Sequence, residues 1–161
     1  MRVAIITLSD SGYAGQREDK SGPVIRELAE AAGYEVVHTV LLPDGIEPLA
    51  SELRRLCDED MADLVLTTGG TGFSPTDLTP EATLSVVERP APGIAEAMRY
   101  NSLQITPRAM LSRAAAGIRK RTLIVNLPGS PKAVRECLEF ILPSLGHGLE
   151  ILRGTAGECA R

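Results

Sequence analysis

The chain has 161 residues, 43% of them hydrophobic and 24% charged, which is typical of a single globular domain. Its formal net charge of −4 disfavours nonspecific binding to nucleic acid, because such binding depends on neutralising phosphates. No apolar run has the length of a membrane span or of a signal peptide, so we expect a cytoplasmic protein that contacts neither nucleic acid nor membrane.

Apolar runs alternate with amphipathic stretches along the chain, a pattern that indicates strands alternating with helices. The first half predicts a strand at residues 3–8, a loop at 9–20, a helix from 21 or 22 to 33, a strand at 35–42, a helix that starts at Asp44, and a strand at 63–68. The second half predicts a helix capped by Thr79, a helix at 93–102, two short strands around Lys120 and Arg121, and a helix at 131–142 that Pro143 and Gly146 interrupt before a last turn at 149–152.

This order predicts right-handed βαβ units and hence an α/β fold: a single three-layer α/β/α domain with a mainly parallel, doubly wound sheet. The domain is expected to span residues 1–153, with 154–161 as a flexible C-terminal tail. Cys57 and Cys137 lie on apolar helix stripes and are expected in the core as reduced thiols, whereas Cys159 falls in the tail.

Four unusual loops follow the predicted strands. They are Ser9-Asp10 after the first strand, Pro43-Asp44-Gly45 after the second, residues 69–77 after the third, and residues 126–130 after the last. In a parallel sheet the loops after the strands' carboxyl ends share one edge, and ligands bind there. We therefore expect the functional site at this edge.

The loop after the third predicted strand carries the strongest signal, Thr67-Thr68-Gly69-Gly70-Thr71-Gly72. Glycines let a ligand approach the backbone closely, and their amides can bind phosphate oxygens. The alternative is a tight strand–helix turn, although a turn rarely needs three glycines in four residues. The loop lacks the lysine of a Walker motif, which disfavours a P-loop kinase or NTPase.

Two aspartates are candidate metal ligands. Asp77 follows the glycine loop, and the predicted cap at Thr79 leaves its carboxylate free for Mg²⁺ and substrate phosphates. The alternative for Asp77 is a solvated loop residue. Asp44 lies three residues before Glu47, so it is equally compatible with a capping box and with a second metal ligand on the same edge.

The remaining polar candidates carry weaker signals. Lys132, near a helix N-terminus, is a candidate for neutralising phosphate, and Arg108 and Arg113 are candidates for facing a ligand or a neighbouring subunit. His38 and His147 lie in unrelated positions, which disfavours a histidine-based zinc site or a catalytic triad. The aromatic content of only 3% disfavours a flavodoxin-like FMN carrier.

Seven segments form a specific combination: Ser9-Asp10, residues 18–22, Leu42-Pro43-Asp44, residues 66–72, residues 77–83, residues 107–113, and Asn126-Leu127-Pro128-Gly129 followed by Pro131-Lys132. In this order they resemble the MogA/MoaB molybdenum-cofactor biosynthesis family, which includes the G domains of gephyrin and its plant counterpart. The resemblance covers the chain from the first predicted strand to the last helix.

The resemblance implies an α/β/α protein that assembles as a homotrimer, or as a hexamer in some MoaB-like members. It implies a nucleotidyltransferase that binds molybdopterin and Mg-ATP and forms adenylyl-molybdopterin with release of pyrophosphate. It also implies a metal-insertase partner of the same pathway. The alternative is a MoaB-like protein that binds molybdopterin without catalysis.

By the same resemblance, Asp44 and Asp77 are the catalytic aspartates that hold Mg²⁺. The implied substrate-binding residues are Ser9, Asp10, Thr68, Gly69, Gly70, Thr71, Gly72, Ser112, Asn126, Pro128, Gly129 and Lys132. Two departures from the family pattern keep the non-catalytic alternative open. Thr76 stands where many relatives have arginine, and the chain lacks the C-terminal extensions of longer MogA-type enzymes.

Overall fold

The structure is a computed structural model and describes residues 1–157 of the chain. Its centre is a six-stranded sheet in the order β2-β1-β3-β6-β5-β4. The strands are β1 (Arg2–Leu8), β2 (Glu35–Leu42), β3 (Leu64–Thr68), β4 (Arg89–Pro90), β5 (Ala116–Arg119) and β6 (Thr122–Leu127). The first four in this order are parallel, and β5 and β4 extend the sheet as antiparallel strands.

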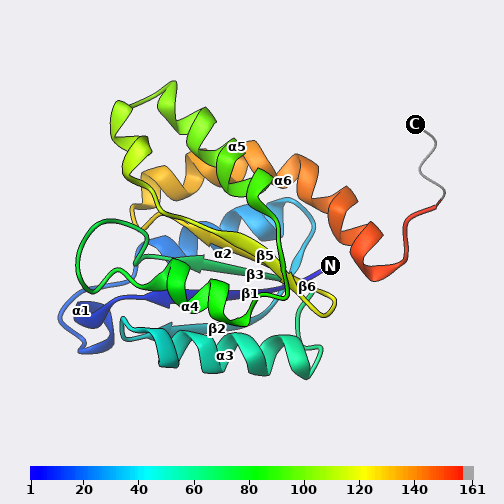
Figure 1. The fold of residues 1–161 in the computed structure, drawn as a ribbon, viewed down its shortest axis with the longest axis horizontal. Coiled ribbons are helices and arrows are strands. Elements are labelled where there is room, and N and C mark those ends of the chain that lie inside the picture. Colours follow the sequence, from blue (N-terminus) through cyan, green and yellow to red (C-terminus); the bar gives the residue numbers. More distant parts are fainter. Residues whose placement is uncertain (158–161) are drawn as a thin grey trace.

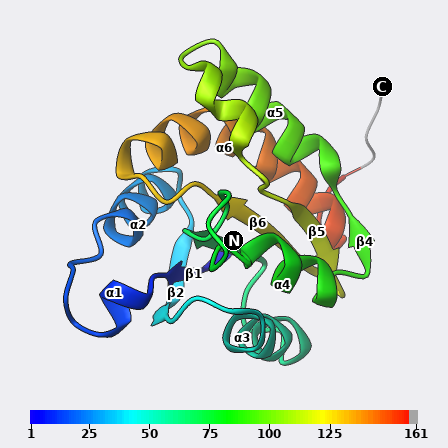
Figure 2. The ribbon, with the colours of Figure 1, turned by 60° about the vertical axis from the view of Figure 1, so that its left-hand side comes forward.

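Helices cover both faces of the sheet (Figures 1 and 2). One face packs against α2 (Ser21–Ala31), α5 (Pro92–Leu103) and α6 (Pro131–Arg153), and the other against α3 (Ile46–Asp58) and α4 (Thr79–Val86). β1, β3 and β6 lie in the middle, and their side chains are buried on both faces, which is why their sequences are almost continuously apolar. The predicted three-layer α/β/α fold with a mainly parallel sheet is therefore confirmed.

Two short helices lie in segments for which the sequence predicts no helix. The first is α1 (Asp10–Tyr13), where the Ser9 hydroxyl accepts a hydrogen bond from the Gly12 amide at 3.0 Å. The second is the 3-10 helix η1 (Pro107–Leu111), which begins in the same way at Thr106. Both segments are too short to show helical periodicity, so only their caps mark them in the sequence.

The prediction that Pro143 and Gly146 interrupt the last helix is wrong. α6 continues for 23 residues from Pro131 to Arg153. An interior proline removes one backbone hydrogen bond, at a cost of about 3 kcal/mol. Here the apolar stripe continues past the proline, with Leu142, Leu145 and Leu149 buried in one core cluster. Burial of these three side chains offsets the cost of the proline.

The predicted core cysteines are confirmed, because Cys57 and Cys137 are both buried and free. α6 ends at Arg153, and the expected tail begins at Gly154, which has a left-handed backbone. Residues 158–161, which include Cys159, lie outside the described residues. Among residues 1–157, no helix is both long enough and apolar enough to cross a membrane.

Candidate functional site

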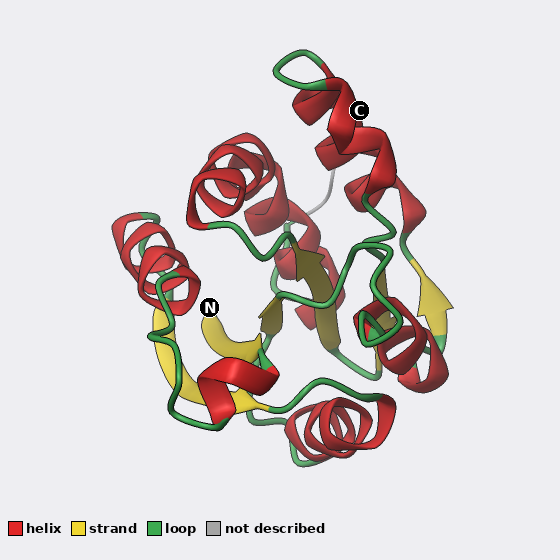
Figure 3. Ribbon diagram, turned by 90° about the vertical axis from the view of Figure 1, so that its left-hand side faces the viewer, coloured by secondary structure: helices red, strands yellow, loops and turns green. Residues whose placement is uncertain are grey.

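The carboxyl ends of the parallel strands meet at one edge of the sheet, which Figure 3 views from the front. In the strand register Thr7 pairs with Thr68 and Thr68 with Leu127, while Leu8 pairs with Leu42. The four predicted loops therefore start side by side. This edge brings the starts of the four predicted loops together.

The glycine loop after β3 makes a turn that only glycine can adopt. Gly69 and Gly70 have φ angles of 94° and 67°, in the left-handed region. A Cβ on Gly69 would collide with the Leu8 carbonyl oxygen, and a Cβ on Gly70 would collide with the Thr79 hydroxyl. The loop thus passes directly over the end of β1, where its backbone is open to a ligand on the other side.

Two threonine hydroxyls fix this loop and its neighbour after β6. The Thr79 hydroxyl donates to the Gly69 carbonyl oxygen at 2.9 Å, and the Thr68 hydroxyl donates to the Pro128 carbonyl oxygen at 2.6 Å. Thr79 is the first residue of α4 and Leu78 precedes it as a cap without a side-chain hydrogen bond, so the prediction that Thr79 caps the helix is wrong. Its hydroxyl stabilises the glycine loop instead.

Asn126 supports the loop from within the core. Its side chain is 0% exposed, and its amide donates to the hydroxyls of Thr67 and Thr83 and accepts from the Ala115 amide. All these groups are internal, so Asn126 fixes the ends of β3 and β6 and does not face the cavities at the edge. Asn126, a predicted substrate-binding residue, therefore lines neither of the cavities described below.

Asp44 does not cap the helix that follows it. α3 begins at Ile46, and its cap is Gly45, which makes no side-chain hydrogen bond. Instead, Asp44 and Asp10 bind each other's backbone: the Asp10 amide donates to Asp44 Oδ2 at 3.1 Å, and the Asp44 amide donates to Asp10 Oδ1 at 2.9 Å. This reciprocal pair joins the loops after β1 and β2 and leaves Oδ1 of Asp44 unused.

Asp44 and Asp77 both lie against the glycine loop. A Cβ built on Gly70 would be 3.6 Å from Asp44 Oδ1, and one built on Gly72 would be 2.8 Å from Asp77 Oδ2. Burial raises the pKa of Asp44, and the negative charges of Asp10 and Asp77 raise it further, against a hydrogen bond from the Asp10 amide. The two aspartates therefore share one electrostatic environment.

The pair is suited to a cation that also binds a ligand. Asp77 Oδ2 accepts from the Ser74 amide at 3.1 Å, so Asp77, like Asp44, keeps one carboxylate oxygen without a hydrogen bond from residues 1–157. Within residues 1–157, no group of three or more His, Cys, Asp or Glu side chains is close enough to hold a metal ion by itself. Mg²⁺ commonly binds through one or two carboxylates and takes its other ligands from water and phosphate. The donor set fits this kind of site.

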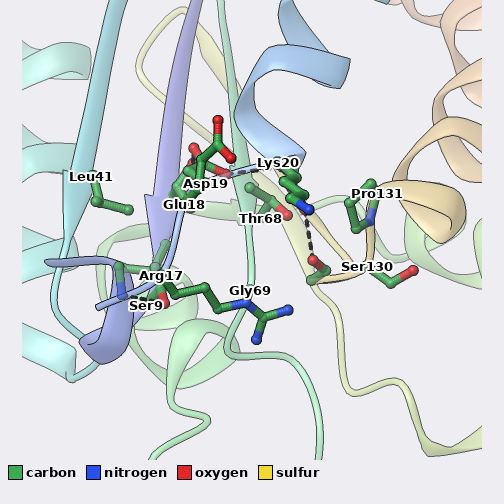
Figure 4. A pocket seen from close by; sticks show the side chains of 15 residues that line it. Ser9, Arg17, Glu18, Asp19, Lys20, Leu41, Thr68, Gly69, Ser130 and Pro131 are labelled. Carbon is green, nitrogen blue, oxygen red and sulfur yellow. Dashed lines mark hydrogen bonds between the residues drawn. The ribbon is translucent and has the colours of Figure 1, made fainter. Parts of the chain in front are cut away.

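A cavity of about 390 Å³ opens beside the glycine loop (Figure 4). Ser9, Thr68, Gly69 and Gly129 line it, as do Arg17 and Lys20 from the loop between α1 and α2. In the described part of the chain neither cation forms an ion pair. Neither residue is a predicted binding residue, although Lys20 lies in the segment 18–22 of the resemblance, because a polar loop gives no indication of where its side chains point.

Lys132 lies elsewhere. Its side chain is 83% exposed, and it pairs with Glu136 on the next turn of α6, with 3.9 Å between Nζ and Oε1. It does not line the 390 Å³ cavity. At this end of α6 the cavity is lined by Ser130 and Pro131. The cations that line this cavity are Arg17 and Lys20, and the side chains of Glu18 and Asp19 line it as well.

A second cavity, of about 300 Å³, lies on the other side of the same loops. Thr71, Gly72, Pro128 and Ser112 line it, and apolar groups such as Met98 form much of its remaining wall. Gly129 packs against Gly69, so the two loops meet between the cavities. The site thus offers two compartments with a shared polar boundary.

Comparisons with known proteins identify the family of this chain. Residues 4–147 match the family model described as "Probable molybdopterin binding domain". The molybdopterin adenylyltransferase of Helicobacter pylori (strain J99) is 40% identical over 156 residues, which are 96% of this chain and 89% of the relative. The molybdopterin adenylyltransferase of Escherichia coli (strain K12) is 41% identical over 150 residues, which are 91% of this chain and 76% of the relative. The crystal structure of the molybdopterin biosynthesis enzyme MoaB from Thermus thermophilus is similar with a TM-score of 0.90 and 48% identity, covering 95% of this chain and 96% of that one.

Replacing Asp44 with Asn tests whether its charge is a cost to the ligand-free fold. Because the pKa of Asp44 is raised in the folded state, its ionised form destabilises the fold at pH 7. We expect Asp44→Asn to raise the melting temperature at pH 7, on the order of 2 °C. The difference should disappear as the pH falls below about 4, where the unfolded chain also takes up the proton.

Differential scanning calorimetry without divalent cations measures this effect. Glu47→Gln is the matched control, because the Glu47 carboxylate is close in sequence but 75% exposed. An Asp44→Asn variant that melts lower than the wild type at pH 7 would contradict the assignment.

Proposed function

Because the chain belongs to the family of probable molybdopterin binding domains, we propose that it is a molybdopterin adenylyltransferase of molybdenum cofactor biosynthesis. In this reaction it transfers AMP from Mg-ATP to molybdopterin and releases pyrophosphate. One observation carries the proposal: Asp44 and Asp77, remote in sequence, lie against the same glycine loop. The first glycine of this loop, Gly69, lines a cavity together with Arg17 and Lys20, neither of which is ion-paired within residues 1–157.

The proposed step is a substitution at the α-phosphorus of ATP. An oxygen of the terminal phosphate of molybdopterin forms a bond to this phosphorus. The bond to the oxygen that bridges the α- and β-phosphates breaks, and pyrophosphate leaves with the bonding electrons. A phosphate monoester is already anionic at neutral pH, so the site needs no strong base. The obstacle is the repulsion between two polyanions.

The carboxylates act on this obstacle. Asp44 and Asp77 would hold Mg²⁺ through their free oxygens, with Asp10 and Ser74 fixing the other oxygen of each. When bound, Mg²⁺ neutralises the phosphates and stabilises the charge that develops on the leaving group. The backbone amides of the glycine loop align the reacting phosphates, and such alignment contributes a large part of the rate.

The cavities divide the two substrates. Arg17 and Lys20 are proposed to bind the terminal phosphate of molybdopterin, because charge-assisted hydrogen bonds are the strong contacts for a phosphate. The second cavity has an apolar wall and a few hydroxyls, among them Ser112, and is proposed to bind the planar adenine ring of ATP. The glycine loop lies between them, where the reacting atoms have to meet.

Asp77→Asn tests the proposed reaction. Asn keeps the hydrogen bond from the Ser74 amide but removes the charge that binds Mg²⁺, so AMP transfer should fall by roughly 100-fold or more while molybdopterin binding stays nearly unchanged. The assay incubates the protein with molybdopterin, Mg²⁺ and α-labelled ATP and measures labelled adenylyl-molybdopterin. Asp58→Asn, at the far end of α3, is the control carboxylate.

Two results would count against the proposal. Near-normal turnover of Asp77→Asn would remove the assigned role of this carboxylate. A wild-type protein that binds molybdopterin but forms no labelled product would favour the alternative, a MoaB-like protein that binds molybdopterin without catalysis.

Arg17→Ala and Lys20→Ala test the phosphate cavity. Loss of a charge-assisted hydrogen bond should raise the half-saturating concentration of molybdopterin about 10-fold for each variant, with a smaller effect on ATP. Arg135→Ala is the control, since Arg135 is an ion-paired cation on the surface of α6. A larger effect in Lys132→Ala than in either cavity variant would return the phosphate site to Lys132.

We also propose self-association, as the family resemblance implies. Six large apolar side chains are exposed near the end of α5, in η1 and on α6, namely Tyr100, Leu103, Ile105, Met110, Leu111 and Phe140. An apolar surface of this kind is typical of an interface between copies. Light scattering during size-exclusion chromatography should give the mass of a trimer or of a hexamer, and a monomer at micromolar concentration would contradict the proposal. The metal-insertase partner stays a prediction from the resemblance.

A further inference from the structure

The segment that presents Asp77 has little support of its own. Between Gly72 and Asp77 the chain forms a surface loop in which Phe73 to Thr76 are all exposed to solvent. Its internal bonds are local: the Asp77 amide donates to the Ser74 carbonyl oxygen at 2.9 Å, and the Ser74 amide donates to the Asp77 carboxylate. The Ser74 hydroxyl also lies within hydrogen-bond distance of the hydroxyl and the amide of Thr76. A segment with exposed backbone bonds and few apolar contacts opens easily. Asp77 therefore needs a support from outside the segment.

We propose that Arg113 is a positioning residue that fixes Asp77 for the metal-bound nucleotide. Its Nε donates to the Gly72 carbonyl oxygen at 2.8 Å, and its Nη2 donates to the Asp77 carbonyl oxygen at 2.5 Å. These two carbonyls are the first and last of the exposed segment. One guanidinium thus closes the segment at both ends, and the inference rests on the proposed role of Asp77.

The backbone of Arg113 contributes a further contact. Its amide donates to the Thr71 carbonyl oxygen at 2.9 Å, so the residue is anchored to the glycine loop itself. The side chain then reaches from this anchor to Gly72 and Asp77. Arg113 thereby ties the glycine loop and the carboxylate into one unit.

Glu81 orients the guanidinium. Its carboxylate forms an ion pair with Arg113 from the first turn of α4, and this pair lowers the pKa of Glu81. The side chains of both residues are partly exposed, at 34% and 42%, and exposed ion pairs contribute little to stability. The pair therefore matters more for orienting the guanidinium than for stabilising the fold. Glu81 is fixed on α4 and orients Arg113, and Arg113 binds both ends of the segment.

A lysine at position 113 cannot reproduce the hydrogen bonds of the guanidinium. A guanidinium presents several N–H donors in one rigid plane, whereas an ammonium is a compact charge on a flexible stem. Arg113→Lys keeps the positive charge near Asp77 but cannot bind Gly72, Asp77 and Glu81 together. The substitution therefore separates positioning from charge.

The chain offers a matched control in Arg119. This residue also binds one carboxylate with two nitrogens, that of Asp58, and donates to one carbonyl oxygen, that of Val86 at 3.0 Å. It lies on β5, away from the exposed segment. Arg119→Lys removes a similar set of bonds without affecting Asp77.

The experiment combines two measurements on the full chain. Hydrogen–deuterium exchange of peptides that cover residues 72–78 reports the order of the segment without any substrate. The Mg²⁺ concentration for half-maximal AMP transfer reports the position of the carboxylate. In Arg113→Lys we expect faster exchange in these peptides and a rise of roughly 10-fold to 100-fold in half-saturating Mg²⁺, with turnover largely recovered at saturating Mg²⁺. Arg119→Lys should change neither quantity.

Several results would overturn the inference. Unchanged exchange, unchanged Mg²⁺ dependence, or the same changes in Arg119→Lys would each do so. If Arg113→Lys does not fold, Glu81→Gln takes its place, and there we expect the same changes at a few-fold smaller size. Failure of the proposed function has a different signature, a wild-type protein that forms no adenylyl product at any Mg²⁺ concentration.

Discussion

The close passage of the glycine loop over the end of β1 is the constraint on which the site depends. Gly69 and Gly70 can turn there only because they have no side chain to collide with Leu8 and Thr79. This turn brings the backbone after β3 next to the reciprocal Asp10–Asp44 pair, and the chain then continues to Asp77. Any larger residue in the turn would move the loop away from β1, and Asp44 and Asp77 would no longer lie against one loop.

The distribution of charge at this edge differs from what stability alone would favour. Asp10, Asp44 and Asp77 lie near one another, and the pKa of Asp44 is raised by burial and by its two neighbours. Arg17 and Lys20 line the adjacent cavity without an ion-pair partner among the described residues. The charge of the half-buried Asp44 is a cost to the empty protein and becomes favourable when a metal ion binds beside it, whereas Arg17 and Lys20 are exposed and solvated. The arrangement supports a site for two anionic substrates.

Much of the fold and the outline of the site could be predicted from the sequence. β1, β3 and β6 are continuous apolar runs, and loops after parallel strands must share an edge, so the placement of Asp44 and Asp77 against one loop follows from topology. The exceptions have physical reasons. α1 is too short for periodicity, α6 crosses Pro143 because its apolar stripe continues, and the Thr79 hydroxyl binds Gly69 rather than capping a helix. Where Arg17, Lys20 and Arg113 point depends on tertiary contacts, which no local pattern encodes.

The central claim is that Asp44 and Asp77 hold one cation together with the nucleotide. A crystal structure of the protein with Mg²⁺ and α,β-methylene-ATP, which cannot be cleaved at the reacting bond, tests it most directly. The account predicts a metal ion in contact with both carboxylates and with phosphate oxygens, and a triphosphate lying along Gly69 to Gly72. A metal ion held by only one of the two aspartates, or a triphosphate bound away from the glycine loop, would contradict it.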